Sequence, residues 1–181
     1  QETKRILDEE QLGVLRQAVL VWHMETEGNR LGLEGWKNHT TKGGGLVNMF
    51  LSHSFHYLEW LFGHVTSVSA SLFRAPDDPR PGETGALIAL TMESGMTVAI
   101  TANAYSFGGE GHHLTVYGDE GKMTLGNPSA DYVKNFTLSV RKRTDDGAQW
   151  LPVSDAIDDY EGDGRIVAVG RLASRFLDGL A

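Results

Sequence analysis

Cysteine, clustered basic residues and long apolar runs are all missing from this sequence. The absence of cysteine excludes a disulfide framework, a thiolate nucleophile and a cysteine-based zinc site, and it fits a reducing cytoplasm. With a formal net charge of −8 and no basic cluster, the chain offers no surface for nucleic acid. No apolar stretch reaches the ~18 residues that cross a bilayer. We therefore expect a cytoplasmic protein that binds neither nucleic acid nor membrane.

The length and composition predict a single domain. There are 181 residues, of which 40% are hydrophobic and 22% charged, enough for one sizeable core but too few for two full domains. The chain opens with Gln-Glu-Thr-Lys, without an initiator methionine or a signal-peptide layout. This opening lies inside a segment, 2–10, that reads as the end of a helix. We expect residues 1–181 to be one domain cut from a longer protein.

Hydrophobic periodicity predicts the remaining elements. Residues 14–26 are rich in Val, Leu and Trp and predict a strand, whereas 27–45 read as a long polar loop with six glycines. The period is helical over 46–62, which ends before Gly63, and again over 163–180. Between these helices it becomes two, with tight turns that predict an antiparallel meander. The expected fold class is α+β, an open, predominantly antiparallel β-sheet with helices packed on one face.

The helix expected over 46–62 has two unlike faces at 100° per residue. One face is apolar and is expected to contact the sheet. The other carries a narrow stripe of Met49, His53, His56 and Trp60. Imidazole, thioether and indole groups suit a pocket wall better than open solvent, and imidazole exchanges a proton near neutral pH. The stripe therefore indicates a binding or catalytic surface.

Two other interpretations of these histidines remain open. Histidines on a mixed helix face are often partners in interior hydrogen bonds. Alternatively, His53 and His56, which are three residues apart, could share a metal with the His112-His113 pair. No HExxH or comparable signature supports a metal site.

The segment that carries the stripe is also the most recognisable part of the sequence. Residues 42–63 read KGGGLVNMFLSHSFHYLEWLFG. This segment resembles the glucose–fructose oxidoreductase/inositol dehydrogenase/MocA (Gfo/Idh/MocA) family, in which a triple glycine leads into a helix with an acid, a histidine four residues later and a closing Trp-Leu-x-Gly. LGVLR at 12–16 is similar to the start of the first strand of the family's C-terminal domain, and LTVYGDEG at 114–121 to one of its hairpins. These matches follow one another in the family's order.

The resemblance implies the substrate-binding and oligomerisation domain of a two-domain oxidoreductase. The first half of such a protein is an N-terminal Rossmann domain, absent from this chain, that binds NAD or NADP. Hydride passes between the nicotinamide and a carbon of a sugar, cyclitol or related polyol. No cofactor-binding residue is expected here, because the GGEG stretch 108–111 joins two strands rather than a strand and a helix. No metal is expected, and the family's open sheets imply a homodimer or higher homo-oligomer through the sheet.

The same resemblance assigns roles along the helix. His53 stands where the family has its catalytic histidine, which hydrogen-bonds the reacting hydroxyl. Met49 stands where many members have Asp, and His56 replaces a common Asp one turn further on. A thioether neither takes a proton nor holds a charge. Either Asn48, Ser52 and His56 reshape the site for another substrate, or the redox step has been weakened or lost.

Two residues before the helix complete the expected substrate site. Lys42 is placed to meet an anionic or hydroxyl-rich substrate near the helix N-terminus, with a solvated loop lysine as the other interpretation. Trp36 either walls the pocket or plugs the loop against the domain. Two other functions remain open: a family-related ligand sensor or scaffold without redox turnover, which Met49 favours, and an unrelated α+β binding domain.

Overall fold

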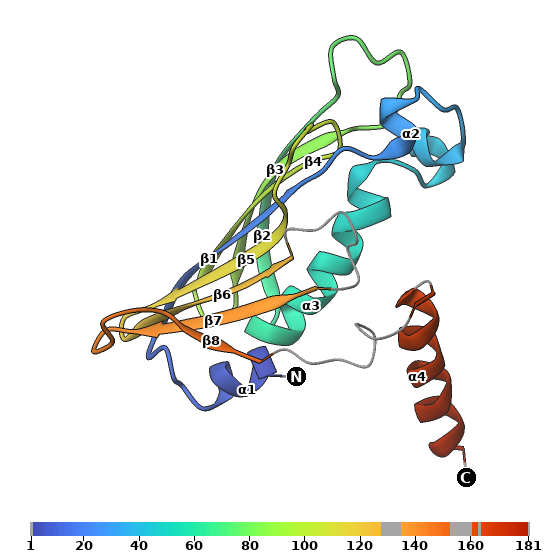
Figure 1. The fold of residues 1–181 in the computed structure, drawn as a ribbon. Helices are drawn as coiled ribbons and strands as arrows, with labels where there is room; N and C mark the ends of the chain where they lie inside the picture. The colour runs from blue at the N-terminus through green and yellow to red at the C-terminus, as the bar shows by residue number, and fades with distance from the viewer. Residues whose placement is uncertain (1, 128–134, 153–160, 163, 181) are drawn as a thin grey trace.

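The computed structural model describes residues 2–127, 135–152, 161–162 and 164–180. Among these residues eight strands form one open sheet in the order β2-β3-β4-β1-β5-β6-β7-β8 (Figure 1). The strands are β1 Leu15–His23, β2 Val65–Phe73, β3 Gly85–Met92, β4 Thr97–Asn103, β5 Gly111–Gly118, β6 Gly121–Asn127, β7 Thr137–Lys142 and β8 Gln149–Leu151. Apart from the parallel pair β1–β4, neighbouring strands are antiparallel. The predicted fold class is confirmed.

Strand β1 lies in the middle of the sheet, between β4 and β5. It pairs in parallel with β4, with Gln17 opposite Thr97 and His23 opposite Asn103. A parallel pair needs a long crossover, and the chain between β1 and β4 supplies one through the central helix and the β2–β3 hairpin. The predicted meander is therefore correct for β2–β4 and for β5–β8, but β1 lies between these two groups of strands. Periodicity does not specify which strands become neighbours.

The helical segments include several that the sequence did not indicate. They are α1 Glu2–Asp8, α2 Glu27–Arg30, the 3-10 turns η1 Trp36–Asn38 and η2 Thr40–Lys42, the π-helical turn η3 Val47–Leu51, α3 Ser52–Phe62 and α4 Gly164–Asp178. The polar loop expected over 27–45 thus contains three short helical turns. The helix expected over 46–62 is confirmed as η3 followed by α3, and it ends at Gly63, whose φ is 88°.

The core lies between α3 and one face of the sheet (Figure 1). Leu51 and Leu58 are fully buried, and Leu61 and Phe62 are nearly so. Each such side chain stabilises the fold by about 1.5–3 kcal/mol when it leaves water. The strands contribute buried side chains that include Leu20, Leu90, Val98, Leu114, Val116, Met123 and Leu138. The apolar face of the helix therefore contacts the sheet, as its sequence pattern predicts.

Helix α4 is amphipathic, as expected, but it lies to one side of the sheet instead of on it (Figure 1). Its large apolar side chains are more than half exposed: Ile166, Val169, Leu172, Phe176 and Leu177. Periodicity identified the helix and its apolar side but not what covers that side. In the described part of the chain, no helix is both long and apolar enough to cross a membrane.

Candidate functional site

The triple glycine allows two close approaches and two backbone conformations with positive φ just before the helix. Gly43 adopts a left-handed conformation with φ 80°, and Gly45 has φ 97°. A Cβ on Gly44 would overlap the carbonyl oxygens of Trp36 and Lys37, and a Cβ on Gly45 would overlap the carboxylate of Glu83. The glycines are therefore required by packing and by backbone conformation, which only glycine adopts at little cost.

Glu83 fixes the first turn of the helix. Its main-chain carbonyl accepts a hydrogen bond from Leu46 N at 3.0 Å, and its Oε1 accepts one from Val47 N at 3.1 Å. The first N–H groups of a helix have no partner within the helix, and an acid there is favourable. The N-terminus that follows the triple glycine is thus already occupied by a carboxylate of the same chain.

The next turn, Val47–Leu51, is π-helical, a feature that is often found at functional sites. Two polar side chains on this part of the helix bond to its own backbone. Asn48 Nδ2 donates to the Gly44 carbonyl at 3.2 Å, and Ser52 Oγ donates to the Asn48 carbonyl at 2.9 Å. Both residues are exposed.

The polar stripe of the helix faces away from the sheet, as its spacing predicts. His53 and His56 are exposed, Trp60 is 52% exposed and Met49 is half-buried. Of these four residues, Met49 lines the cavity described below, and His53, His56 and Trp60 do not. The side of the helix that carries His53 and His56 is therefore open, and its role as a binding or catalytic surface stays a prediction.

His112 has the opposite environment from these two histidines. It lies on β5 and is buried beneath α3. A hydrogen bond of 2.9 Å joins its Nε2 to the Tyr57 hydroxyl, and the rings of Trp22 and Phe136 contact it edge-on. Burial lowers the pKa of His112 to about 4, so this imidazole is neutral near pH 7. No group of three or more potential metal ligands converges among the described residues, and the alternative in which His112 joins His53 in a metal site fails.

A cavity of about 470 Å³ opens beside the N-terminal end of the helix. The segment from Thr26 to Asn38 forms one wall, and the first turns of the helix form the other. Residues 82–84 and Ala104 close the base. Trp36 and Met49, both predicted to contact substrate, line this cavity. Three charged residues that the sequence did not single out also line it, namely Glu34, Lys37 and Glu83.

The other predicted contact residues lie outside this cavity. Lys42 is exposed in η2 and does not line it. Asn48, His53 and His56 are also absent from the lining. Met49 is thus the residue that connects the cavity to the histidine stripe.

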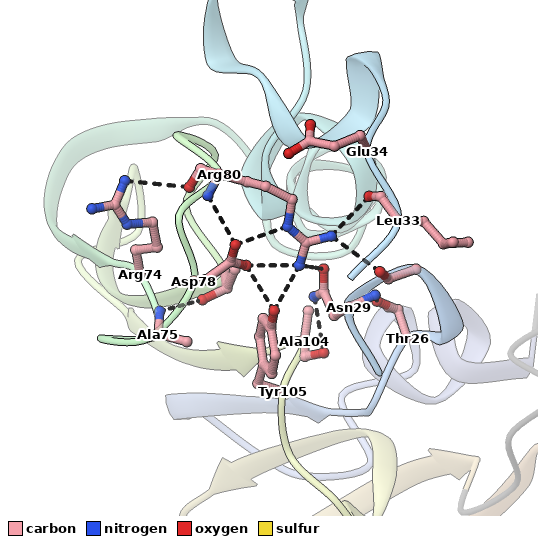
Figure 2. Close-up of polar contacts among 12 residues, drawn as sticks. Thr26, Asn29, Leu33, Glu34, Arg74, Ala75, Asp78, Arg80, Ala104 and Tyr105 are labelled. Atoms are coloured by element: carbon pink, nitrogen blue, oxygen red, sulfur yellow. Dashed lines mark hydrogen bonds and ion pairs between the residues drawn. The ribbon is translucent and has the colours of Figure 1, made fainter. Parts of the chain in front are cut away.

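A buried ion pair holds the wall of the cavity in place (Figure 2). Arg80 contacts Asp78 through two hydrogen bonds of 2.8 and 2.7 Å, and both side chains are almost completely buried. The Arg80 guanidinium holds the pKa of the Asp78 carboxyl well below its usual range. The guanidinium also donates to the carbonyls of Gly28 and Leu33, to Asn29 Oδ1 and to the Tyr105 hydroxyl. Gly28, Asn29 and Leu33 line the cavity, so this network shapes it.

These features define an α+β domain in which an open sheet carries one helix, entered through three glycines, with histidines on its outer side. The chain matches the GFO/IDH/MocA C-terminal domain model over residues 1–124, and it belongs to that family.

Known relatives agree with this assignment. The uncharacterized oxidoreductase sll0816 of Synechocystis sp. is 34% identical over 139 residues, which are 70% of this chain and 38% of that protein. Levoglucosan dehydrogenase, solved with NADH and levoglucosan, has a TM-score of 0.70 at 15% identity, over 84% of this chain and 43% of its own. The WlbA dehydrogenase of Bordetella pertussis, solved with NADH and UDP-GlcNAcA, has a TM-score of 0.63 at 19% identity, over 76% and 42%. The chain spans less than half the length of each.

Proposed function

We propose that this chain is the substrate-binding and dimerisation domain of an NAD(P)-dependent oxidoreductase that acts on a sugar, cyclitol or related polyol. Family membership supports an oxidoreductase. Of the two structures named above, one was solved with NADH and levoglucosan and the other with NADH and UDP-GlcNAcA. The observation that carries the proposal is the exposure of the His53 imidazole on the outer side of a helix whose other side is sealed. A Rossmann domain outside this chain would complete the site over that outer side.

Among the described residues, the helix start after the triple glycine does not favour a cofactor phosphate. The helix that follows the triple glycine would be a candidate, because helix N-termini bind phosphate. The Glu83 carboxylate accepts from Val47 N at that point, and a second anion would be repelled there. We therefore assign binding of NAD or NADP mainly to the Rossmann domain, and no metal is needed.

In this proposal His53 handles the proton of the reaction. A nicotinamide held by the other domain would supply the hydride acceptor for the carbinol carbon of the substrate. His53 hydrogen-bonds the reacting hydroxyl and accepts its proton as the carbon–oxygen bond becomes a carbonyl, and it returns the proton in the reverse direction. Trp36 and Met49 contact the rest of the substrate in the cavity. His56, Asn48 and Lys42, which lie outside the cavity, would contact substrate only where the other domain brings it to them.

The test uses the intact protein with NAD or NADP and a panel of sugars and cyclitols. His53→Gln keeps a hydrogen-bonding side chain but removes the imidazole, and we expect kcat to fall by roughly 10²–10⁴-fold. The matched control is His64→Gln, because His64 is 86% exposed at the end of the same helix and should leave kcat unchanged. If His53→Gln turns over as fast as the control, His53 has no catalytic role.

One observation favours a second function, a family-related sensor or scaffold without redox turnover. Met49 lines the cavity at the position where related sequences have an acid, and its thioether cannot exchange a proton. Binding of a sugar without reduction of NAD(P) by the intact wild-type protein would favour this second function.

We also propose a cytoplasmic location, which the absence of cysteine fits.

A further part of the proposal is that two copies of the protein associate through the open face of the sheet. A shallow depression on β1–β4 is lined only by uncharged residues, which include Val19, Ser69, Ser71, Leu87, Ala89, Ala99 and Thr101. An uncharged, partly apolar sheet face is suited to pairing with a second copy of itself.

A further inference from the structure

The cavity beside the helix is built from groups that suit one kind of ligand. Trp36 presents an indole that is 52% exposed, and the apolar face of a sugar ring can stack on such a surface. Of the polar lining residues, Asn29 and Thr84 already have partners: Asn29 Nδ2 donates to Ala104 O, and Thr84 Oγ1 accepts from Ala75 N. The polar groups available to a ligand are therefore mainly the charged ones.

Those charged groups are two carboxylates and one ammonium. Glu34 and Glu83 line the cavity together with Lys37. Oε1 of Glu83 accepts from Val47 N, and a Gln at this position could accept the same bond. The helix start therefore does not require a negative charge at position 83. Carboxylates accept hydrogen bonds from hydroxyl and ammonium groups but repel phosphate and carboxylate groups.

The cavity is continuous with the proposed reaction site through one residue. Met49 lines the cavity and precedes His53 by four residues, which is about 6 Å along a helix. A ligand that extends from the cavity past Met49 therefore approaches His53.

We infer that this cavity takes an uncharged or amino-bearing polyhydroxylated ring and rejects sugar phosphates and uronates. The part of this inference that concerns turnover rests on the proposed reaction at His53, whereas the part that concerns binding rests only on the cavity. The inference assigns Glu34 and Glu83 as specificity-determining residues that act through hydrogen bonds to ring hydroxyls and through repulsion of anions. Lys37 brings one positive charge to the lining, and Nε2 of His39 lies 3.4 Å from Oε2 of Glu34.

The first experiment measures kcat/KM of the intact oxidoreductase for matched substrates. Glucose, myo-inositol and glucosamine are compared with glucose 6-phosphate and glucuronate. We expect at least a tenfold preference for the uncharged and amino-bearing compounds. The Glu34→Gln/Glu83→Gln double variant keeps the side-chain shape and the bond to Val47 N. In this variant the ratio of kcat/KM for uncharged compounds to kcat/KM for anionic compounds should fall at least fivefold. Glu93→Gln is the control, because it removes the same charge from an exposed turn outside the cavity lining.

The second experiment measures binding without turnover. Quenching of tryptophan fluorescence is titrated with the same compounds in the intact wild type and in Trp36→Phe, and the difference reports on Trp36. We expect quenching by glucose or myo-inositol, and at least tenfold weaker quenching by glucuronate.

The two readouts separate the two proposals. Equal use of charged and uncharged sugars, or a double variant that behaves like Glu93→Gln, overturns the inference while the oxidoreductase function stands. Binding of uncharged rings at Trp36 without turnover supports the inference and refutes the proposed reaction. Failure of both readouts refutes both.

Discussion

Acid should destabilise this fold through one buried histidine, His112. It is 7% exposed, and it contacts the Tyr57 hydroxyl and the rings of Trp22 and Phe136. Protonation would place a charge in this apolar setting without a carboxylate partner in contact with it. We therefore expect the substitution His112→Gln, which keeps a polar acceptor near Tyr57 but cannot titrate, to remove most of the acid sensitivity between pH 6.5 and 4.

The magnitude follows from the pKa of His112, which burial lowers from 6.5 to about 4. Between these values the unfolded chain binds a proton at this site and the folded chain does not, so stability falls as the pH falls. Above pH 6.5 both states are neutral at this site and the contribution is complete. Below pH 4 both are protonated and the loss has levelled off. At about 1.4 kcal/mol per unit of pKa, the full loss is about 3 kcal/mol.

The assay is urea unfolding of wild type and His112→Gln at closely spaced pH values from 4 to 7.5. The difference between the two curves isolates His112, because the substitution leaves the other titrating groups in place. The Gln variant should be less stable at pH 7.5, owing to altered packing, but should lose less stability on acidification. If the two curves run parallel from pH 7 to 4, the folded chain protonates His112 as readily as the unfolded chain, and the reasoning from burial is wrong.

Two further predictions concern packing and assembly. Arg80→Met should lower the free energy of unfolding by about 3–5 kcal/mol because it leaves Asp78 buried without its partner. Arg16→Met, which breaks the exposed pair with Asp119, should lower it by no more than about 1 kcal/mol. Equal losses of the two variants in urea unfolding would contradict this difference between a buried and an exposed pair. The chain should elute as a dimer in sizing experiments with light scattering, and Leu87→Glu, which places a charge on the open sheet face, should weaken association at least about tenfold; a wild-type monomer would count against pairing through the sheet.

Periodicity predicted the elements well where one side of an element is buried. The helix over 46–62 was located correctly because Leu51, Leu58 and Phe62 recur at helical spacing and all contact the sheet. The π-helical turn inside it was not predictable, because its extra backbone residue leaves no mark on so short a pattern. The position of β1 next to β4 was also missed, since their pairing joins residues about 80 positions apart.

The candidate site was predictable only where it lies on one helix. The stripe with His53 follows from spacing along the chain, but the cavity is made by segments that meet only in the fold. Glu83 reaches the helix from 36 residues downstream, and nothing in its own neighbourhood indicates that contact. The sequence singled out Lys42 because it adjoins the glycines, whereas Lys37 is the lysine that lines the cavity.

The contrast between His53 and His112 shows why burial, rather than residue type, decides which histidine can work in catalysis. His53 lies on α3 and His112 lies on β5 beneath it. Each has an imidazole, the side chain that suits acid–base chemistry near neutral pH. His112 is sealed beneath the helix, where its lowered pKa keeps it neutral and its Nε2 is already bonded to Tyr57. A substrate hydroxyl cannot reach it. His53 stands on the outer side, beyond Met49 and the acidic cavity, where a hydroxyl can approach. The reaction that we propose therefore belongs on the outer side of α3.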